Sequence, residues 1–60
     1  MLDSWSNRGV LYTINATSEA GGIITAEAEK EGEKTLYSRV VPKQVTREEA
    51  ENLFAADFAQ

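Results

Sequence analysis

The sequence predicts a small α+β domain with the order β-β-β-α, in which a three-stranded antiparallel meander carries one C-terminal helix packed on one face. Three observations lead to this fold. Between residues 10 and 41, apolar and polar residues alternate with period two, and glycine-containing turns interrupt the alternation. Pro42, which cannot donate to a ladder, then ends the strand region. A helix-capping signal follows at Thr46.

Residues 1–9 are predicted to be an irregular lead-in to a single domain over residues 10–60. Turn-forming residues such as Ser4, Asn7 and Gly9 are frequent in this segment. The segment also lacks the basic-then-apolar layout of a signal peptide. A chain of 60 residues is long enough for one small core, so we expect no second domain.

The first strand is predicted from Val10 to Thr17, because its first residues are mostly β-branched or aromatic. One face of this strand would carry Val10, Tyr12, Ile14 and Ala16. Residues 18–22 should then turn, since Gly21-Gly22 permits positive φ angles at little cost.

The second strand is predicted from Ile23 to Lys30. A helix is the alternative here, because residues 26–30 are Ala, Glu and Lys, which are good helix formers. The run Ile23-Ile24-Thr25 and the flanking glycines favour the strand.

The third strand is predicted from Lys34 to Val41, after a hairpin turn at residues 31–33. Leu36 and Val40 share one face of this strand, and Tyr37 and Val41 share the other. The loop length decides which pair joins which sheet face. A two-residue loop places Tyr37 beside Ala26 or Ala28, whereas a three-residue loop exchanges the faces.

The helix is predicted to start after Thr46, because Thr46 and Glu49 have the spacing of a capping box. Its apolar arc should contain Ala50, Leu53, Phe54 and Phe58. Asp57 falls within the same arc. The simple interpretation is a solvated last turn, and the alternative is a partner such as Arg39 or Lys43.

One helix can cover only one face of the sheet, so the other face should expose contiguous apolar residues, which are typical of an interface. The residues expected at this interface are Trp5, Leu11, Ile23, Tyr37 and Val41. Because the chain has no disulfide or zinc ligands to stabilise a small core, we expect a homodimer through a sheet face or edge. Scattered apolar surface residues, which are normal, are the competing explanation.

The composition narrows the function classes. The chain has no His and no Cys, so it lacks imidazole and thiol catalysts, and we expect no catalytic, cofactor or metal site. The net charge of -4 makes nucleic acid an unfavoured ligand and favours a protein partner with a basic surface. No apolar run is long enough for a membrane span, and a cytoplasmic protein without a membrane partner is expected.

Acidic residues recur at alternate positions in one hairpin: Glu27, Glu29, Glu31 and Glu33. A solvated hairpin that discourages aggregation is the simplest explanation. The functional alternative is a small inhibitor, of phage or mobile-element origin, that presents this acidic hairpin as a nucleic-acid mimic.

Residues 34–47 contain no acid and four bases: Lys34, Arg39, Lys43 and Arg47. They suit cross-strand pairs with Glu27 and Glu29, and they also allow a weak nucleic-acid binder. The leading hypothesis remains a small acidic, non-enzymatic protein-binding module or regulatory subunit.

Overall fold

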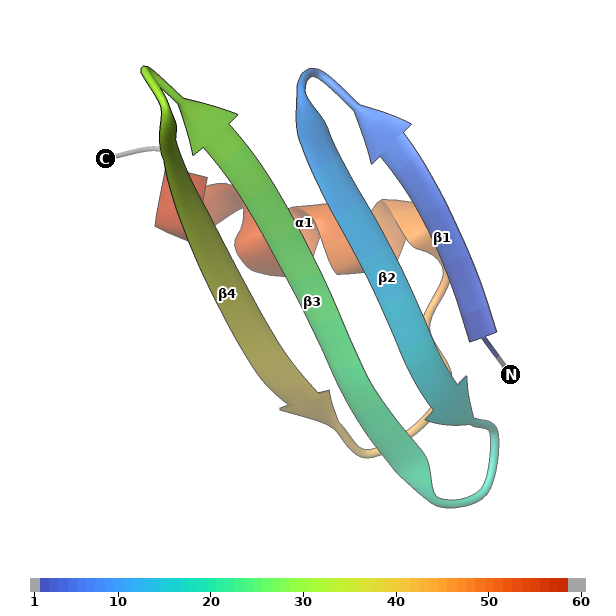
Figure 1. Cartoon of the computed structure of the whole chain (residues 1–60). Helices are drawn as coiled ribbons and strands as arrows, with labels where there is room; N and C mark the ends of the chain where they lie inside the picture. Colours follow the sequence, from blue (N-terminus) through green and yellow to red (C-terminus); the bar gives the residue numbers. More distant parts are fainter. Residues whose placement is uncertain (1, 59–60) are drawn as a thin grey trace.

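The computed structural model of the chain describes residues 2–58. Two layers make up the fold: a four-stranded antiparallel sheet in sequence order, and one helix that crosses behind it (Figure 1). The elements are β1 (Leu2–Asn7), β2 (Val10–Thr17), β3 (Gly21–Lys30), β4 (Glu33–Val41) and α1 (Arg47–Phe58).

The predicted three-stranded meander is wrong by one strand, although the α+β class holds. Leu2–Asn7, expected to be irregular, forms β1 and pairs antiparallel with β2, from Leu2 opposite Asn15 to Asn7 opposite Val10. Serine and asparagine favour turns through local hydrogen bonds, but pairing with a neighbouring strand overrides that preference. Met1, the first residue of the expected lead-in, lies outside the described residues.

Two hairpin turns have the same backbone conformation. Arg8 and Gly9 have φ angles of 53° and 80°, and Glu31 and Gly32 have φ angles of 54° and 81°. Positive φ at both central residues is the mark of a two-residue type I′ turn, whose twist matches that of the strands. The second turn places Tyr37 opposite Ala26, as predicted for a two-residue loop.

The connection between β2 and β3 is shorter than expected. Gly21 and Gly22 already belong to β3, where they pair with Thr17 and Ala16. A side chain at Gly22 would collide with the backbone of β2, because its Cβ would lie 2.0 Å from the carbonyl oxygen of Asn15.

The core lies between the sheet and α1. One row of cross-strand partners, Trp5, Tyr12, Ala26 and Tyr37, crosses all four strands on this side. Ala26 is the small member of the row, and the ring of Phe54 is fully buried in the same core, 6.3 Å from the ring of Tyr12. The buried residues are Tyr12, Ile14, Ala16, Ile24, Ala26, Val41, Ala50 and Phe54.

The predicted capping box is confirmed. The backbone NH of Glu49 donates to Oγ1 of Thr46 over 3.1 Å, and the backbone NH of Thr46 donates to Oε1 of Glu49 over 3.0 Å. The hydrogen bond from the backbone NH of Thr46, with a smaller contribution from the Thr46 side chain, holds the pKa of Glu49 below its usual value. Leu53 departs from prediction and stays 41 % exposed, because the buried stripe of the helix is narrow and centres on Ala50 and Phe54.

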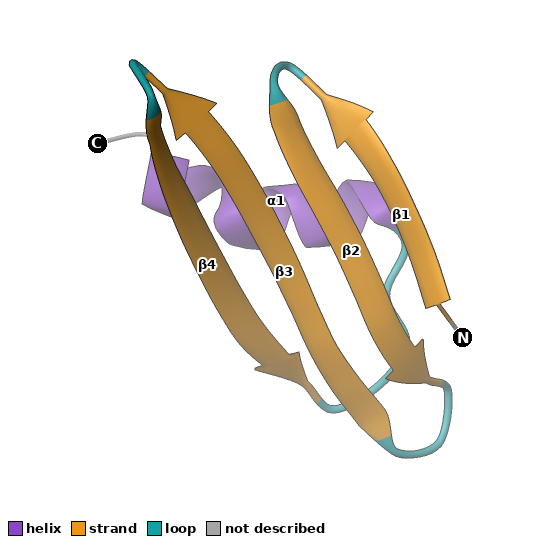
Figure 2. Ribbon diagram, in the orientation of Figure 1, coloured by secondary structure: helices purple, strands orange, loops and turns teal. Residues whose placement is uncertain are grey.

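The helix crosses the strands instead of running along one of them. Its N-terminal end lies behind β1 and its C-terminal end lies behind β4, while the other side of the sheet carries no further layer (Figure 2). We call this bare side the open face and the helix side the covered face.

Candidate protein-interaction surface

The open face consists of three cross-strand rows that each span the four strands. The outer rows contain Leu2, Asn15, Ile23 and Val40, and Ser6, Leu11, Glu27 and Leu36. The row between them contains only hydroxyl side chains: Ser4, Thr13, Thr25 and Ser38. Along the strands, a hydroxyl row therefore lies between two rows that are mainly apolar.

The apolar residues of the two outer rows remain accessible. Their exposed fractions are 72 % for Leu2, 48 % for Leu11, 52 % for Ile23, 63 % for Leu36 and 82 % for Val40. Single exposed leucines are common on protein surfaces, but five apolar residues gathered on one sheet face are the pattern of a contact surface.

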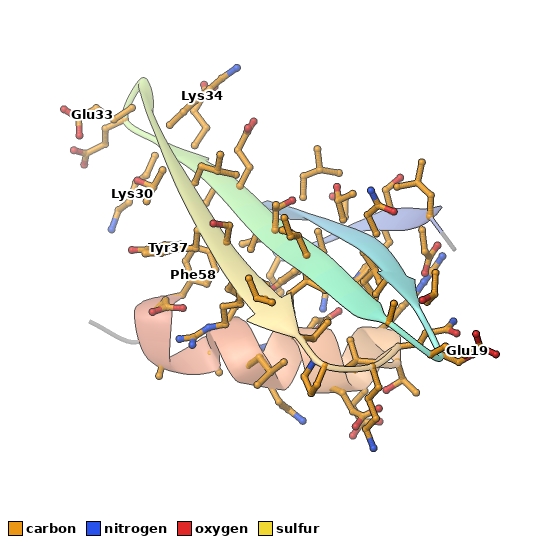
Figure 3. The ribbon with its side chains drawn as sticks, turned by 90° about the horizontal axis from the view of Figure 1, so that it is seen from below. Glu19, Lys30, Glu33, Lys34, Tyr37 and Phe58 are labelled. Carbon is orange, nitrogen blue, oxygen red and sulfur yellow. The ribbon has the colours of Figure 1, made fainter. Side chains whose placement is uncertain are left out.

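Charge is nearly absent from the three rows of the open face. The chain has 10 acidic and 6 basic residues, yet within residues 2–58 only Glu27 belongs to the three rows. Glu29 and Lys34 are cross-strand partners and lie one step further out on this face, towards the tip of the β3–β4 hairpin. Figure 3 shows Lys34 on the side of the hairpin away from the helix. An uncharged centre with a charged rim is the usual layout of a protein interface.

Both edge strands turn a charged side chain towards the helix. On β1, the Nε and Nη2 atoms of Arg47 each donate over 2.8 Å to the carboxylate of Asp3. On β4, Nη2 of Arg39 donates over 3.0 Å to Oδ2 of Asp57, so Asp57 has the partner proposed as the alternative to a solvated last turn. Inward-pointing charges on edge strands hinder the addition of further strands. The edges of the sheet are therefore poorly suited to pairing with a strand of another chain. The open face is the better candidate for a contact with another protein.

Three of the five residues expected at the interface lie on the covered face. Trp5 is half-buried, stacks on Tyr12 at a ring distance of 5.2 Å, and donates from Nε1 to Glu51 over 2.7 Å. Tyr37 packs edge-on against Phe58 at 5.0 Å between sheet and helix, as Figure 3 shows, and Val41 is buried. These three residues thus belong to the core and its margin.

Leu11 and Ile23 are on the open face, as expected, and Leu36 and Val40 stand where Tyr37 and Val41 were placed. The signal that identifies them is the Glu31-Gly32 pair, because a two-residue turn fixes the β3–β4 register. Leu2 was missed for a different reason, since no strand was predicted before Val10.

The acidic hairpin does not form one continuous surface. Glu27 and Glu29 lie on the open face, Glu31 lies in the turn, and Glu33 pairs with Lys30 on the side of the helix. Each outer glutamate of the hairpin therefore has a basic neighbour, Lys34 for Glu29 and Lys30 for Glu33. This arrangement breaks up the row of carboxylates that phosphate mimicry needs.

The four bases of residues 34–47 are also dispersed. Lys34 lies on the open face, and Lys43 lies in the connection from β4 to α1. Arg39 and Arg47 form ion pairs at opposite edges of the sheet. A phosphate backbone would therefore meet no contiguous basic track along this stretch.

The covered face contains a shallow groove of about 470 Å³ between the Arg8-Gly9 end of the sheet and the last turns of α1. Its carboxylate, Glu51, already accepts hydrogen bonds from Trp5 and Asn7. Burial, with a smaller contribution from the charge of Glu51, raises the pKa of Tyr12, so this phenol remains neutral at physiological pH. Within residues 2–58, no group of three His, Cys, Asp or Glu side chains is placed to hold a metal ion.

The helix α1 is the only helix among residues 2–58, and it is too short and too polar to cross a bilayer. No protein-family model, no curated protein and no solved structure matches the chain.

Proposed function

We propose that the chain is a small, non-enzymatic protein-binding module or regulatory subunit and that the open face is its binding surface. The observation that carries the proposal is the concentration of exposed apolar residues on a sheet face with a single charge in its three rows. Depletion of charge at the centre of a surface patch distinguishes interfaces from ordinary surface.

The chemistry of the other surfaces supports the same choice. The carboxylates of the hairpin lie on two sides of the sheet, and two of the four bases are neutralised at opposite edges. Both arrangements count against a nucleic-acid mimic and against a nucleic-acid binder. The absence of Cys from the sequence suits a reducing compartment, and we place the module in the cytoplasm.

Site-specific photo-cross-linking tests the proposal. A photo-reactive amino acid replaces Leu36 on the open face, or Leu53 on the outer side of the helix, in the cells that naturally produce the protein. Both positions are exposed leucines, so the second is a matched control for the first. We expect a defined protein adduct from position 36 and none from position 53.

The identity of the adduct then separates the possibilities. A second copy of the chain or a different protein at position 36 supports the open face as a binding surface. Equal adducts from both positions, or none from position 36, would contradict the proposal.

A further inference from the structure

We infer that the occupant of the open face is a second copy of this chain, packed sheet face to sheet face. The inference rests on the proposed function, since it takes the open face to be a protein-binding surface. In such a dimer two sheets form the centre and the two helices lie outermost, each on the covered face of its own sheet.

The open face has the size that a dimer needs. The fold measures 38 × 19 × 15 Å, and helix and sheet are stacked as two layers. The broad face therefore covers at most about 700 Å² in projection, close to the ~800 Å² of accessible surface that each partner of a stable complex contributes. That contribution is roughly a fifth of the 4404 Å² of accessible surface.

The chemistry of the open face suits contact with its own copy. Two identical sheets that pack face to face are related by a two-fold axis lying between them. An axis through the centre of the face, along or across the strands, maps the hydroxyl row of Ser4, Thr13, Thr25 and Ser38 onto itself. A hydroxyl group both donates and accepts hydrogen bonds, so it can form a hydrogen bond with a hydroxyl group of the second copy. Two like charges in the same positions would repel each other. The rows on either side of this centre supply the apolar contacts, from Leu2, Ile23 and Val40 in one row and from Leu11 and Leu36 in the other.

The monomer also lacks the buried volume that small domains usually need. Among residues 2–58, eight residues are buried, and three of these are the alanines Ala16, Ala26 and Ala50. No disulfide or structural zinc is available, because the sequence has neither Cys nor His. Burial of Leu11, Ile23, Leu36 and Val40 against a second sheet would supply a second apolar layer.

Glu27 distinguishes a second copy from a partner with a basic surface. It is half-exposed between Leu11 and Leu36, its cross-strand neighbours. A symmetric dimer would bury two such carboxylates, and burial of an unpaired charge opposes association. A basic partner would instead use the same carboxylate as an attractive contact.

The experiment measures mass by light scattering on the purified full chain from about 1 μM to about 1 mM, a range that brackets ordinary dimer affinities. Three variants accompany the natural chain: Val40→Lys on the open face, Leu53→Lys on the helix as the matched control, and Glu27→Gln. We expect a dimer for the natural chain and for Leu53→Lys, and a monomer for Val40→Lys. Glu27→Gln should lower the dimer dissociation constant by about tenfold or more, because two charges are removed from one interface.

Fluorescence of Trp5, the single tryptophan, reports whether each variant is folded, since its ring stacks on Tyr12 in the covered face. If Val40→Lys unfolds the chain, Leu36→Lys takes its place, because Leu36 is exposed on the same face. A natural chain that is monomeric throughout would overturn the second-copy inference. The inference would also be overturned if the folded Val40→Lys or Leu36→Lys variant remained a dimer, or if Glu27→Gln weakened the dimer. An adduct with another protein at position 36 would still support the proposed function.

Discussion

Asp3 and Arg47 show how one pair of side chains joins the first strand to the start of the helix. Their atoms lie 44 positions apart in sequence, and the guanidinium also lies 5.1 Å from the ring of Trp5. The hydrogen bonds from Arg47 are the main influence that lowers the pKa of Asp3. This pairing was unpredictable from sequence, because residues 1–9 gave no strand signal and Asp3 therefore had no assigned place.

The lowered pKa of Asp3 predicts how folding responds to acid. A carboxylate with a depressed folded-state pKa adds stability above its unfolded pKa, about 3.9, and this stability is lost as pH falls through the folded value. Asp3→Asn should therefore be less stable than the natural chain at neutral pH and should lose less stability on acidification. Urea unfolding followed by Trp5 fluorescence between about pH 7 and about pH 2 measures both effects.

Glu49 has a lowered pKa for a separate reason, its bonds to Thr46, and it titrates in both chains. Its contribution therefore cancels when the two pH profiles are subtracted. Identical profiles for Asp3→Asn and the natural chain would show that the Arg47 contact has no energetic role.

Among the elements, the strands in which apolar and polar residues alternate were predicted from the sequence, whereas β1 was not. Val10–Thr17 was predicted with its observed bounds, and the Thr46 capping box was identified from spacing alone. In β1, the residues facing the helix are Asp3, Trp5 and Asn7, so its inward side is only partly apolar. An edge strand whose inner side is half polar shows little alternation, and its existence depends on the partner strand.

The turns of the two hairpins contain avoidable strain. Arg8 and Glu31 adopt positive φ angles that cost little for Asn or Gly and more for other residues. Glu31→Asn should raise the free energy of unfolding by a few tenths to about 1 kcal/mol, because Asn-Gly is the preferred type I′ sequence. Thermal unfolding followed by circular dichroism checks this expectation.

Glu33→Gln is the control for the charge that Glu31→Asn removes, since Glu33 stands in the same hairpin but outside the turn. If both variants raised the thermal unfolding midpoint equally, the cause would be the lost charge and not the backbone conformation of the turn.

At the scale of the whole molecule, the sheet has one face sealed by α1 and one face left apolar and bare (Figure 1). That a second apolar face exists was predictable from sequence, because a single helix cannot cover both sides. Which residues of β4 belong to it stayed open, because this depended on one residue more or less in the β3–β4 loop. A shift by one position moves every side chain of a strand to the other face.

A dimer built on this face makes stability depend on concentration. Because association favours only folded protomers, the thermal midpoint should rise as the protein concentration rises. Differential scanning calorimetry at two concentrations about a hundredfold apart, for the natural chain and Val40→Lys, measures this dependence. The natural chain should shift and the variant should not. A constant midpoint for the natural chain would argue for a monomeric folding unit.

The order of the elements has a consequence for how the chain folds. Every strand pairs with its neighbour in sequence through a short turn, so no crossover connection is needed to form the sheet. The helix that seals Tyr12, Ile14 and Ile24 is synthesised after all four strands. A sheet on which α1 has not yet docked would therefore expose apolar side chains on both faces, those of the future core and those of the open face. Species with exposed hydrophobic surface of this kind are prone to associate with other chains.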